Sequence, residues 1–295
     1  MSSTALAVAD SGRGVAGRQA STDAQVVAMW LHGTAPNTAR AYRREAAAFS
    51  AFVGGAVLPA VTLGDVQAYA DHLEARGLAP ATRARALAAV KSLLTFAHRI
   101  GYLPVNVGAA ERLPRLKFTL AERIVPREVV AALITGEPSP RNRALLRLLY
   151  FGGLRESEAC GLRWRDVQAR AGGGVQVTVY GKGAKTRVVL LPAAIAAELA
   201  ELRGAAGADA PVFAGRGGAL TASQVWRIVK AAGARAGVPA LSPHWLRHAH
   251  ASHALDGGAG IHVVRDTLGH ASLATTSRYL HARPGDSSAL YLAAV

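Results

Sequence analysis

Hydrophobic residues recur every three to four positions through the first third of the chain, which is the spacing of helices with one buried face. The pattern predicts a helix that runs to Phe52 with Asn37 as its polar N-cap, another over about 65–76, and a longer one after Pro80. Together with a helical stretch that begins at Asp23, these segments predict a small all-α bundle of four helices. In the longest helix one apolar stripe consists of Leu87, Val90, Leu94 and Ala97.

The pattern changes in the second half of the chain. It is helical from about Arg127 to Leu162, and then residues 175–179 alternate between apolar and polar with β-branched side chains. After a Gly-Lys-Gly turn, residues 187–191 complete a predicted β-hairpin, and helices resume from Ala193. The predicted fold class is therefore mainly α with a small antiparallel β-sheet (α+β).

A length of 295 residues predicts two domains, each large enough to bury its own core. The stretch between the helical bundle and the second half is basic, lacks periodicity and has proline near both ends, which is typical of a linker. The predicted organisation is a flexible N-terminal tail (1–21), a helical domain (22–112), a linker (113–126), a second domain (127–282) and a C-terminal tail (283–295).

The chain carries 34 Lys and Arg against 19 Asp and Glu, a net charge of +15. Such a balance favours a polyanionic partner. The single cysteine, Cys160, excludes an internal disulfide, and no run of about 18 apolar residues is present to cross a membrane. Because the first 20 residues also lack the features of a signal peptide, we expect a cytoplasmic protein.

Seven of the ten histidines lie between His244 and His281, which asks for a specific explanation. His244 and His248 are four residues apart, as zinc ligands on one helix face can be. However, no Asp or Glu lies between Ser242 and Leu255 to complete a metal site. We therefore predict no metal and no other cofactor.

A site for phosphate chemistry explains the histidine-rich region better than a metal site does. His244 and Arg247 are three residues apart on a predicted helix, where an imidazole and a guanidinium together suit a phosphodiester. Downstream, Gly269 ends a helix and leaves His270 in a loop, and Tyr279 follows nine residues later in the last predicted helix. Upstream, Arg155 follows a diglycine at a predicted helix start, with Glu158 on the same face.

These motifs together resemble the tyrosine recombinase (phage integrase) family, including the Xer-type recombinases, over essentially residues 22–282. The segment around His244 and Arg247 resembles the His-x-x-Arg box, and residues 268–279 resemble the part that carries the nucleophilic tyrosine. Residues 153–158 are similar to the first arginine motif, and residues 181–187 to the hairpin that carries the catalytic lysine.

The resemblance implies a SAM-like core-binding domain, which contacts DNA, and a catalytic domain. It implies a site-specific recombinase or integrase that cuts and rejoins double-stranded DNA through a 3′-phosphotyrosyl intermediate, without metal or ATP. It also implies a tetramer on DNA, alone or with a related recombinase. Two alternatives stay open: a DNA-relaxing enzyme like the type IB topoisomerases, and a non-catalytic DNA-binding regulator on the same scaffold.

The resemblance also implies a role for each site residue. Tyr279 is the nucleophile, and Arg155 and Arg247 hold the phosphate, to which His270 also bonds. His244 assists proton transfer at the tyrosine, and Lys182 protonates the leaving oxygen. Glu158 orients neighbouring basic groups.

Further basic groups carry weaker indications. Arg40, Arg43 and Arg44 share one helix face and are candidate DNA contacts, although a solvated face explains them as well. Lys185 competes with Lys182 for the role of the catalytic lysine. The C-terminal tail either docks on a neighbouring protomer, as the resemblance implies, or packs on its own domain. His248, His250 and His253 are interpreted as structural residues or minor phosphate contacts.

Overall fold

The computed structural model describes residues 19–116, 120–181 and 185–280. Most of the predicted N-terminal tail, the whole C-terminal tail and Lys182 lie outside these residues. The chain divides into two compact units, Met1–Lys117 and Phe118–Val295, which are described separately here. Within the described ranges no helix is long and apolar enough to cross a lipid bilayer.

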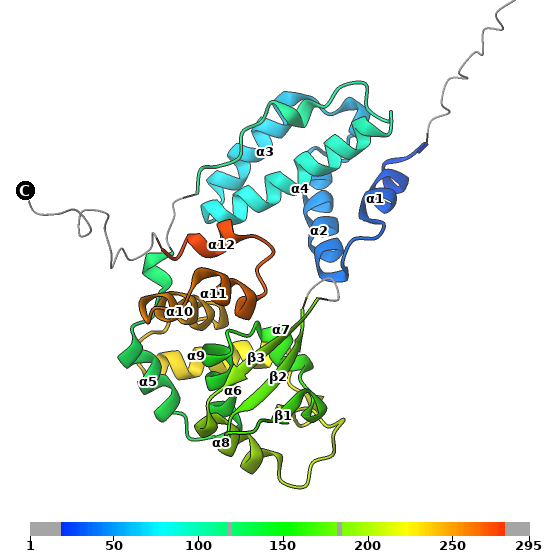
Figure 1. Ribbon diagram of the computed structural model, residues 1–295. Coiled ribbons are helices and arrows are strands. Elements are labelled where there is room, and N and C mark those ends of the chain that lie inside the picture. The colour runs from blue at the N-terminus through cyan, green and yellow to red at the C-terminus, as the bar shows by residue number, and fades with distance from the viewer. Residues whose placement is uncertain (1–18, 117–119, 182–184, 281–295) are drawn as a thin grey trace, which may run out of the picture. The chain divides into compact units, whose positions relative to one another are not determined.

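The first unit is the predicted bundle of four helices. Trp30 on the first helix stacks on Tyr42 of the second, with ring centroids 5.0 Å apart, and its indole N–H donates to Ser92 on the fourth. The predicted apolar stripe of the fourth helix is buried throughout, at 0–1% exposure. The helices are α1 (Asp23–Leu31), α2 (Pro36–Phe52), α3 (Leu63–Ala75) and α4 (Pro80–Arg99), with short 3-10 turns η1 (Leu58–Ala60) and η2 (Val107–Ala109) (Figure 1).

The start of α2 differs from the prediction. Ala35 is the N-cap and Pro36 occupies the first turn, so that the predicted cap, Asn37, lies inside the helix. Proline is favoured at the first helical position because its fixed φ suits the helix and its missing N–H would be unpaired there. The Asn37 side chain instead accepts a hydrogen bond from Arg40 at 3.2 Å.

The second unit combines helices with a small antiparallel sheet, which confirms the predicted fold class. Its helical elements are η3 (Ala121–Arg123), α5 (Arg127–Thr135), α6 (Pro140–Phe151), α7 (Glu156–Gly161), η4 (Trp164–Asp166), α8 (Ala193–Arg203), α9 (Ala222–Arg235), α10 (Pro243–Asp256), α11 (Ile261–Leu268) and α12 (Leu273–Ser277). Its strands are β1 (Val167–Ala169), β2 (Val175–Tyr180), β3 (Thr186–Leu191), β4 (Ala214–Gly215) and β5 (Gly218–Ala219).

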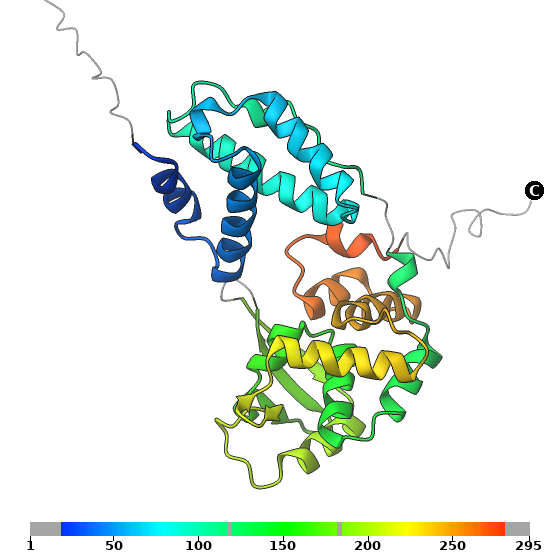
Figure 2. The ribbon, with the colours of Figure 1, turned by 180° about the vertical axis from the view of Figure 1, so that it is seen from behind.

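The predicted hairpin is β2 paired with β3, and β1 adds a third strand that the sequence pattern did not indicate. Val177 in the centre of β2 pairs with Val167 on one side and Val189 on the other. Alternate residues of β2 are buried, as the period of two requires. The sheet faces the viewer in Figure 1 and α9 does so in Figure 2, so the two lie on opposite faces of this unit.

The second unit begins to pack before Arg127. Ile124 and Val125, inside the predicted linker, are only 3% exposed, and Val125 belongs to the main core of this unit. Hydrophobicity alone did not mark this packing, because Leu113 and Leu116 in the same predicted linker are 43% and 57% exposed.

Candidate active site

Arg155 stands at the start of α7, where the chain turns sharply. Gly153 adopts a left-handed φ of +57°, and a Cβ there would lie 2.7 Å from Leu268 Cδ2, so that only glycine fits. The carboxylate of Glu158 accepts the backbone N–H of Arg155 at 2.8 Å, which closes the first turn of the helix. The glycine turn and the helix start therefore position the Arg155 side chain, as the sequence predicted.

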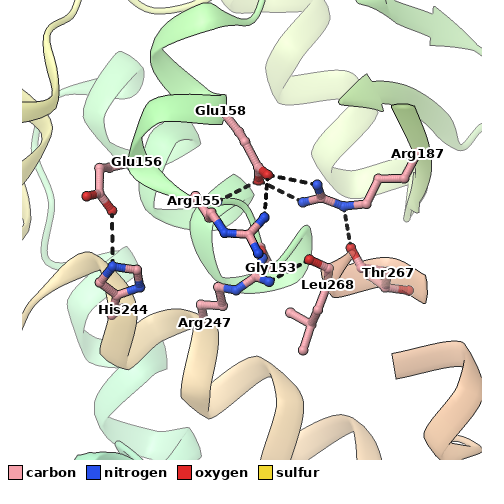
Figure 3. A network of polar contacts seen from close by, with 9 residues as sticks. All are labelled: Gly153, Arg155, Glu156, Glu158, Arg187, His244, Arg247, Thr267 and Leu268. Carbon is pink, nitrogen blue, oxygen red and sulfur yellow. Dashed lines mark hydrogen bonds and ion pairs between the residues drawn. The ribbon is translucent and has the colours of Figure 1, made fainter. Parts of the chain in front are cut away.

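Glu158 joins two arginines. Its carboxylate, 3% exposed, accepts from Arg155 Nη1 at 2.7 Å and from Arg187 Nη1 and Nη2 at 2.9 and 2.7 Å (Figure 3). Burial alone would raise the pKa of Glu158, but the hydrogen bonds from Arg187 and Arg155 lower it to about 2. Glu158 is thus anionic at neutral pH and forms an ion pair with both guanidinium groups.

Arg187 was missed among the candidate residues. It projects from β3, and its Nε donates to the carbonyl oxygen of Thr267 at 2.6 Å, which ties the hairpin to the end of α11. A signal was present in the sequence: Arg187 has the same parity as the buried Val189 and Leu191 on β3. A charged side chain on the inward face of a strand needs a buried partner.

Arg247 lies in α10 and is only 4% exposed. Its two terminal nitrogens donate to the carbonyl oxygens of Gly153 and Leu268, and therefore join the start of α7 to the end of α11. Burial and the nearby Arg155 charge lower the pKa of Arg247 to about 9, which leaves it cationic at neutral pH. The hydrogen bonds that Arg247 makes within the described residues use two of its five N–H donors.

His270 follows the C-terminus of α11 at a left-handed glycine, Gly269, as predicted. Its Nδ1 lies 2.9 Å from the hydroxyl oxygen of Thr276, and its ring is parallel to that of Tyr279 with centroids 6.4 Å apart. Burial, followed by the charge of Arg247, lowers the pKa of His270 to about 4. The imidazole is therefore neutral at pH 7.

Tyr279 lies outside the helix in which it was predicted. α12 ends at Ser277, and the backbone N–H groups of Tyr279 and Leu280 bond to carbonyl groups three residues back, the tighter pattern of a helix end. Its phenol oxygen lies 2.7 Å from Nδ1 of His248, and the side chain is 6% exposed. Burial raises the pKa of Tyr279, although the charge of Arg247 opposes the shift.

His248, interpreted from the sequence as a structural residue or a minor phosphate contact, is the residue that contacts the phenol of Tyr279. It lies one helical turn after His244 on α10, with the two rings stacked at 6.4 Å. His244 itself has a 59% exposed side chain, and its Nε2 is 3.9 Å from a carboxylate oxygen of Glu156. The i, i+4 spacing that suggested a metal pair thus places one imidazole towards solvent and the next against Tyr279.

Arg155, Arg187 and His270 line a cavity of about 620 Å³. Lys185 lines it as well, together with Arg265 and its ion-pair partner Asp266. Because Glu158 neutralises only one of three guanidinium groups in this cluster, the cavity presents a positive field to an anion. Lys182 lies outside the described residues. The candidate DNA contacts Arg40, Arg43 and Arg44 belong to the other unit, where all three are exposed on α2.

Comparison with known proteins identifies the class. Residues 123–285 match the family described as "Phage integrase family", and residues 30–101 match "Phage integrase, N-terminal SAM-like domain". The chain therefore belongs to the phage integrase family, the tyrosine recombinases, and is a site-specific DNA recombinase, an enzyme that cleaves and rejoins DNA. The resemblance stated from the four motifs is confirmed.

Individual relatives agree over most of the chain. It is 38% identical over 279 residues to tyrosine recombinase XerC of Rhodospirillum centenum (85% of this chain, 80% of that protein). It is 36% identical over 276 residues to tyrosine recombinase XerD of Mycobacterium tuberculosis (84% and 88%). In fold it is similar to a lambda integrase dimer bound to a core site, with a TM-score of 0.72 and 18% identity over 90% of this chain and 95% of that one. These relatives are recombinases, not topoisomerases or regulators.

Proposed function

We propose that Tyr279 attacks a DNA phosphodiester in line and forms a phosphotyrosyl linkage. Family resemblance makes the linkage 3′ and the released group a 5′-hydroxyl. The observation that carries this proposal is the convergence of three distant segments: Arg247 donates to the carbonyl groups of Gly153, two residues before Arg155, and of Leu268, two residues before His270, whose ring is parallel to that of Tyr279 at 6.4 Å. A phenol needs a positive field, because its usual pKa of about 10 leaves little phenolate at neutral pH.

Arg155 and Arg247 hold the two non-bridging oxygens of the phosphate and offset the charge that develops on the pentacoordinate phosphorus. Arg155 lines the cavity, and Arg247 keeps donors available although two carbonyl groups bind it. Loss of one such donor typically costs about 100-fold or more in rate. Arg155→Ala and Arg247→Ala are expected to slow cleavage to that extent.

The remaining groups handle protons and orientation. His270 donates to a phosphate oxygen from its loop beside the cavity, and Glu158 holds Arg155 in place. Lys182, by its match to the family position, protonates the leaving oxygen, and Lys185 is the alternative in the same hairpin. The family resemblance gives His244, exposed at the start of α10, the role of assisting proton transfer at the tyrosine.

No metal or nucleotide is needed for this chemistry, since each phosphoester bond broken is kept as another phosphoester. The partner is a double-stranded DNA recombination site, contacted by Arg40, Arg43 and Arg44 of the core-binding domain (22–112) as well as by the catalytic domain (127–282). The relative similar in fold is a dimer on its core site. For this chain we expect a tetramer on two duplexes, alone or with a related recombinase.

The test starts by finding the DNA. Sheared genomic DNA bound by the Tyr279→Phe protein is sequenced, and the enriched site is built as a nicked duplex whose cleavage releases a short fragment. Wild type is expected to form a covalent protein–DNA adduct without added metal, and Tyr279→Phe to bind the same duplex without forming one. An adduct that persists in Tyr279→Phe, or none with wild type, would overturn the proposal. Strand exchange between two such sites then separates recombination from simple relaxation.

A further inference from the structure

The phenol oxygen of Tyr279 already has a hydrogen-bond partner in the structure. Nδ1 of His248 lies 2.7 Å from it, well within hydrogen-bond distance. In the described part of the chain no hydrogen bond links Tyr279 to His244, the residue that family resemblance places at the tyrosine. The contact with the nucleophile therefore belongs to the next turn of α10.

The surroundings of His248 decide which atom holds the proton. The charged and titratable groups that face it are His244 and Arg247 on its own helix, Arg123 on η3, and Tyr279 and His270 beyond α11. Burial, followed by the nearby His244 and the cations Arg123 and Arg247, lowers the pKa of His248 to about 4. At neutral pH the imidazole is uncharged, and Nδ1 can accept the phenolic O–H.

Two imidazoles lie near the Tyr279 ring. The ring centroid of His248 is 5.7 Å from that of Tyr279, and the His270 ring is parallel to the tyrosine ring with centroids 6.4 Å apart. Nδ1 of His270 lies 2.9 Å from the hydroxyl oxygen of Thr276, and among the described residues no hydrogen bond joins this imidazole to the phenol of Tyr279. Of the three nearby imidazoles, the geometry selects His248 as the acceptor.

We propose that His248 is the catalytic base of the cleavage step and accepts the proton of Tyr279 through Nδ1. This inference rests on the proposed function of Tyr279. As the bond between the phenol oxygen and phosphorus forms, the phenolic O–H bond breaks and its proton moves to Nδ1 of His248. At the same time the bond between phosphorus and the 5′ oxygen breaks, and that oxygen takes a proton from Lys182, the proposed acid. During rejoining the same proton returns to the phenol oxygen. The anionic phosphate, once bound, stabilises the imidazolium.

The test compares two substitutions in the full-length chain on the nicked duplex. His248→Asn keeps a hydrogen-bond acceptor near the position of Nδ1 but cannot take up a proton, whereas His248→Ala removes both. A base contributes about 100- to 10,000-fold, so both variants are expected to form the adduct at least about 100-fold more slowly than wild type, with duplex affinity within about threefold. His262→Asn, an exposed histidine on α11, serves as the matched control and is expected to match wild type.

The outcomes separate a base from a positioning contact. A His248→Asn protein that recovers to within about threefold of wild type would assign only positioning to His248, and an active His248→Ala protein would overturn the proposal altogether. The rate of wild type is also expected to rise with pH on an acidic limb that His248→Asn lacks. Circular dichroism checks that both variants fold.

A measurement without DNA keeps this inference separate from the proposed function. The ¹⁵N chemical shift of His248 Nδ1 is expected to change between wild type and Tyr279→Phe, because the phenol O–H bonds to that nitrogen. Identical shifts would contradict the contact even where no adduct is obtained. Absence of a wild-type adduct, by contrast, counts against Tyr279 as the nucleophile.

Discussion

Arg187 and Glu158 form a two-point ion pair, in which the terminal guanidinium nitrogens lie 2.9 and 2.7 Å from the two carboxylate oxygens. Arg187 comes from the hairpin and Glu158 from α7, and the arginine also reaches Thr267 at the end of α11. Since Glu158 in turn holds Arg155, the pair connects β3 to the predicted phosphate-binding arginine. The ion pair therefore fixes the position of β3 relative to α7.

Arg187→Lys tests this connection. An ammonium group keeps the charge but cannot bond both oxygens of Glu158 and Thr267 at once. Because the pair is buried, we expect the free energy of unfolding to fall by about 2–3 kcal/mol, measured by urea denaturation. The matched control is Arg165→Lys, whose exposed pair with Asp209 is expected to change stability by less than about 1 kcal/mol. Equal effects of the two substitutions would contradict the connecting role of Arg187.

Gly153→Ala is expected to damage both stability and the site. The residue has a left-handed φ, and an added Cβ would meet Leu268 Cδ2 at 2.7 Å and His250 at 3.1 Å. The left-handed conformation alone costs about 1–2 kcal/mol for alanine, and the crowding displaces the carbonyl group that Arg247 binds. We expect a clear drop in thermal stability together with slower adduct formation.

Gly161→Ala provides the control for that prediction. Gly161 lies in the last turn of α7, and nothing stands within 4 Å of a Cβ added there. Alanine is favoured over glycine in a helix by about 1 kcal/mol, so thermal stability should hold or rise slightly. A Gly153→Ala protein as stable and active as Gly161→Ala would show that the turn before Arg155 tolerates a side chain.

Partly buried, neutral histidines should make the fold sensitive to acid. Burial lowers the pKa of His250 from 6.5 to about 4, as it does for His248 and His270. Below about pH 6.5 the unfolded chain binds protons that the folded chain refuses, so the free energy of unfolding falls as pH drops from about 6.5 towards 4. For His250 the loss amounts to about 3 kcal/mol at most.

The measurement for this prediction is urea denaturation at several pH values between 4 and 7. The His250→Gln protein is expected to lose stability less steeply than wild type over that window, because one of the three groups no longer titrates. His262→Gln, at an exposed position on α11, should keep the wild-type slope. Parallel curves for wild type and His250→Gln would contradict the assignment of a buried neutral imidazole.

The arginines of α2 give a prediction about DNA affinity. Arg44 lies 3.0 Å from Glu45, and Arg40 and Arg43 are exposed on the same helix. If both contact phosphates, the Arg40→Gln, Arg43→Gln double variant should flatten the plot of log affinity against log salt by about 1.8, at about 0.9 for each contact. Arg165→Gln, which removes an arginine already paired with Asp209, is the control. An unchanged slope in the double variant would show that Arg40 and Arg43 face solvent and do not contact DNA phosphates.

Much of this architecture could be predicted from local patterns. The stripe from Leu87 to Ala97 and the alternation in β2 depend on a single period and a single buried face, and both were confirmed. The positions of Arg155 and His270 were equally readable, because each follows a glycine in a left-handed turn. Where a single local feature determines the backbone conformation, the sequence was sufficient to predict the element and the position of its residues.

Contacts between distant segments could not be predicted in the same way. The bond between His248 and Tyr279 spans 31 residues, and that between Arg187 and Glu158 spans 29, so neither follows from the periodicity of one element. The ends of short helices could not be predicted from the hydrophobic pattern either. α12 ends at Ser277, after which the backbone hydrogen bonds of Tyr279 and Leu280 reach only three residues back, so Tyr279 lies outside the helix. Burial, which is a property of the whole fold, determined the protonation of the three histidines.

The most direct test is to identify the residue that carries the DNA. The wild-type adduct on the nicked duplex is digested with protease and nuclease, and the peptide that retains a nucleotide is sequenced by tandem mass spectrometry. We expect a single modified residue, Tyr279, bonded to a 3′ phosphate. A nucleotide on any other side chain, such as the tail residue Tyr291, would contradict it.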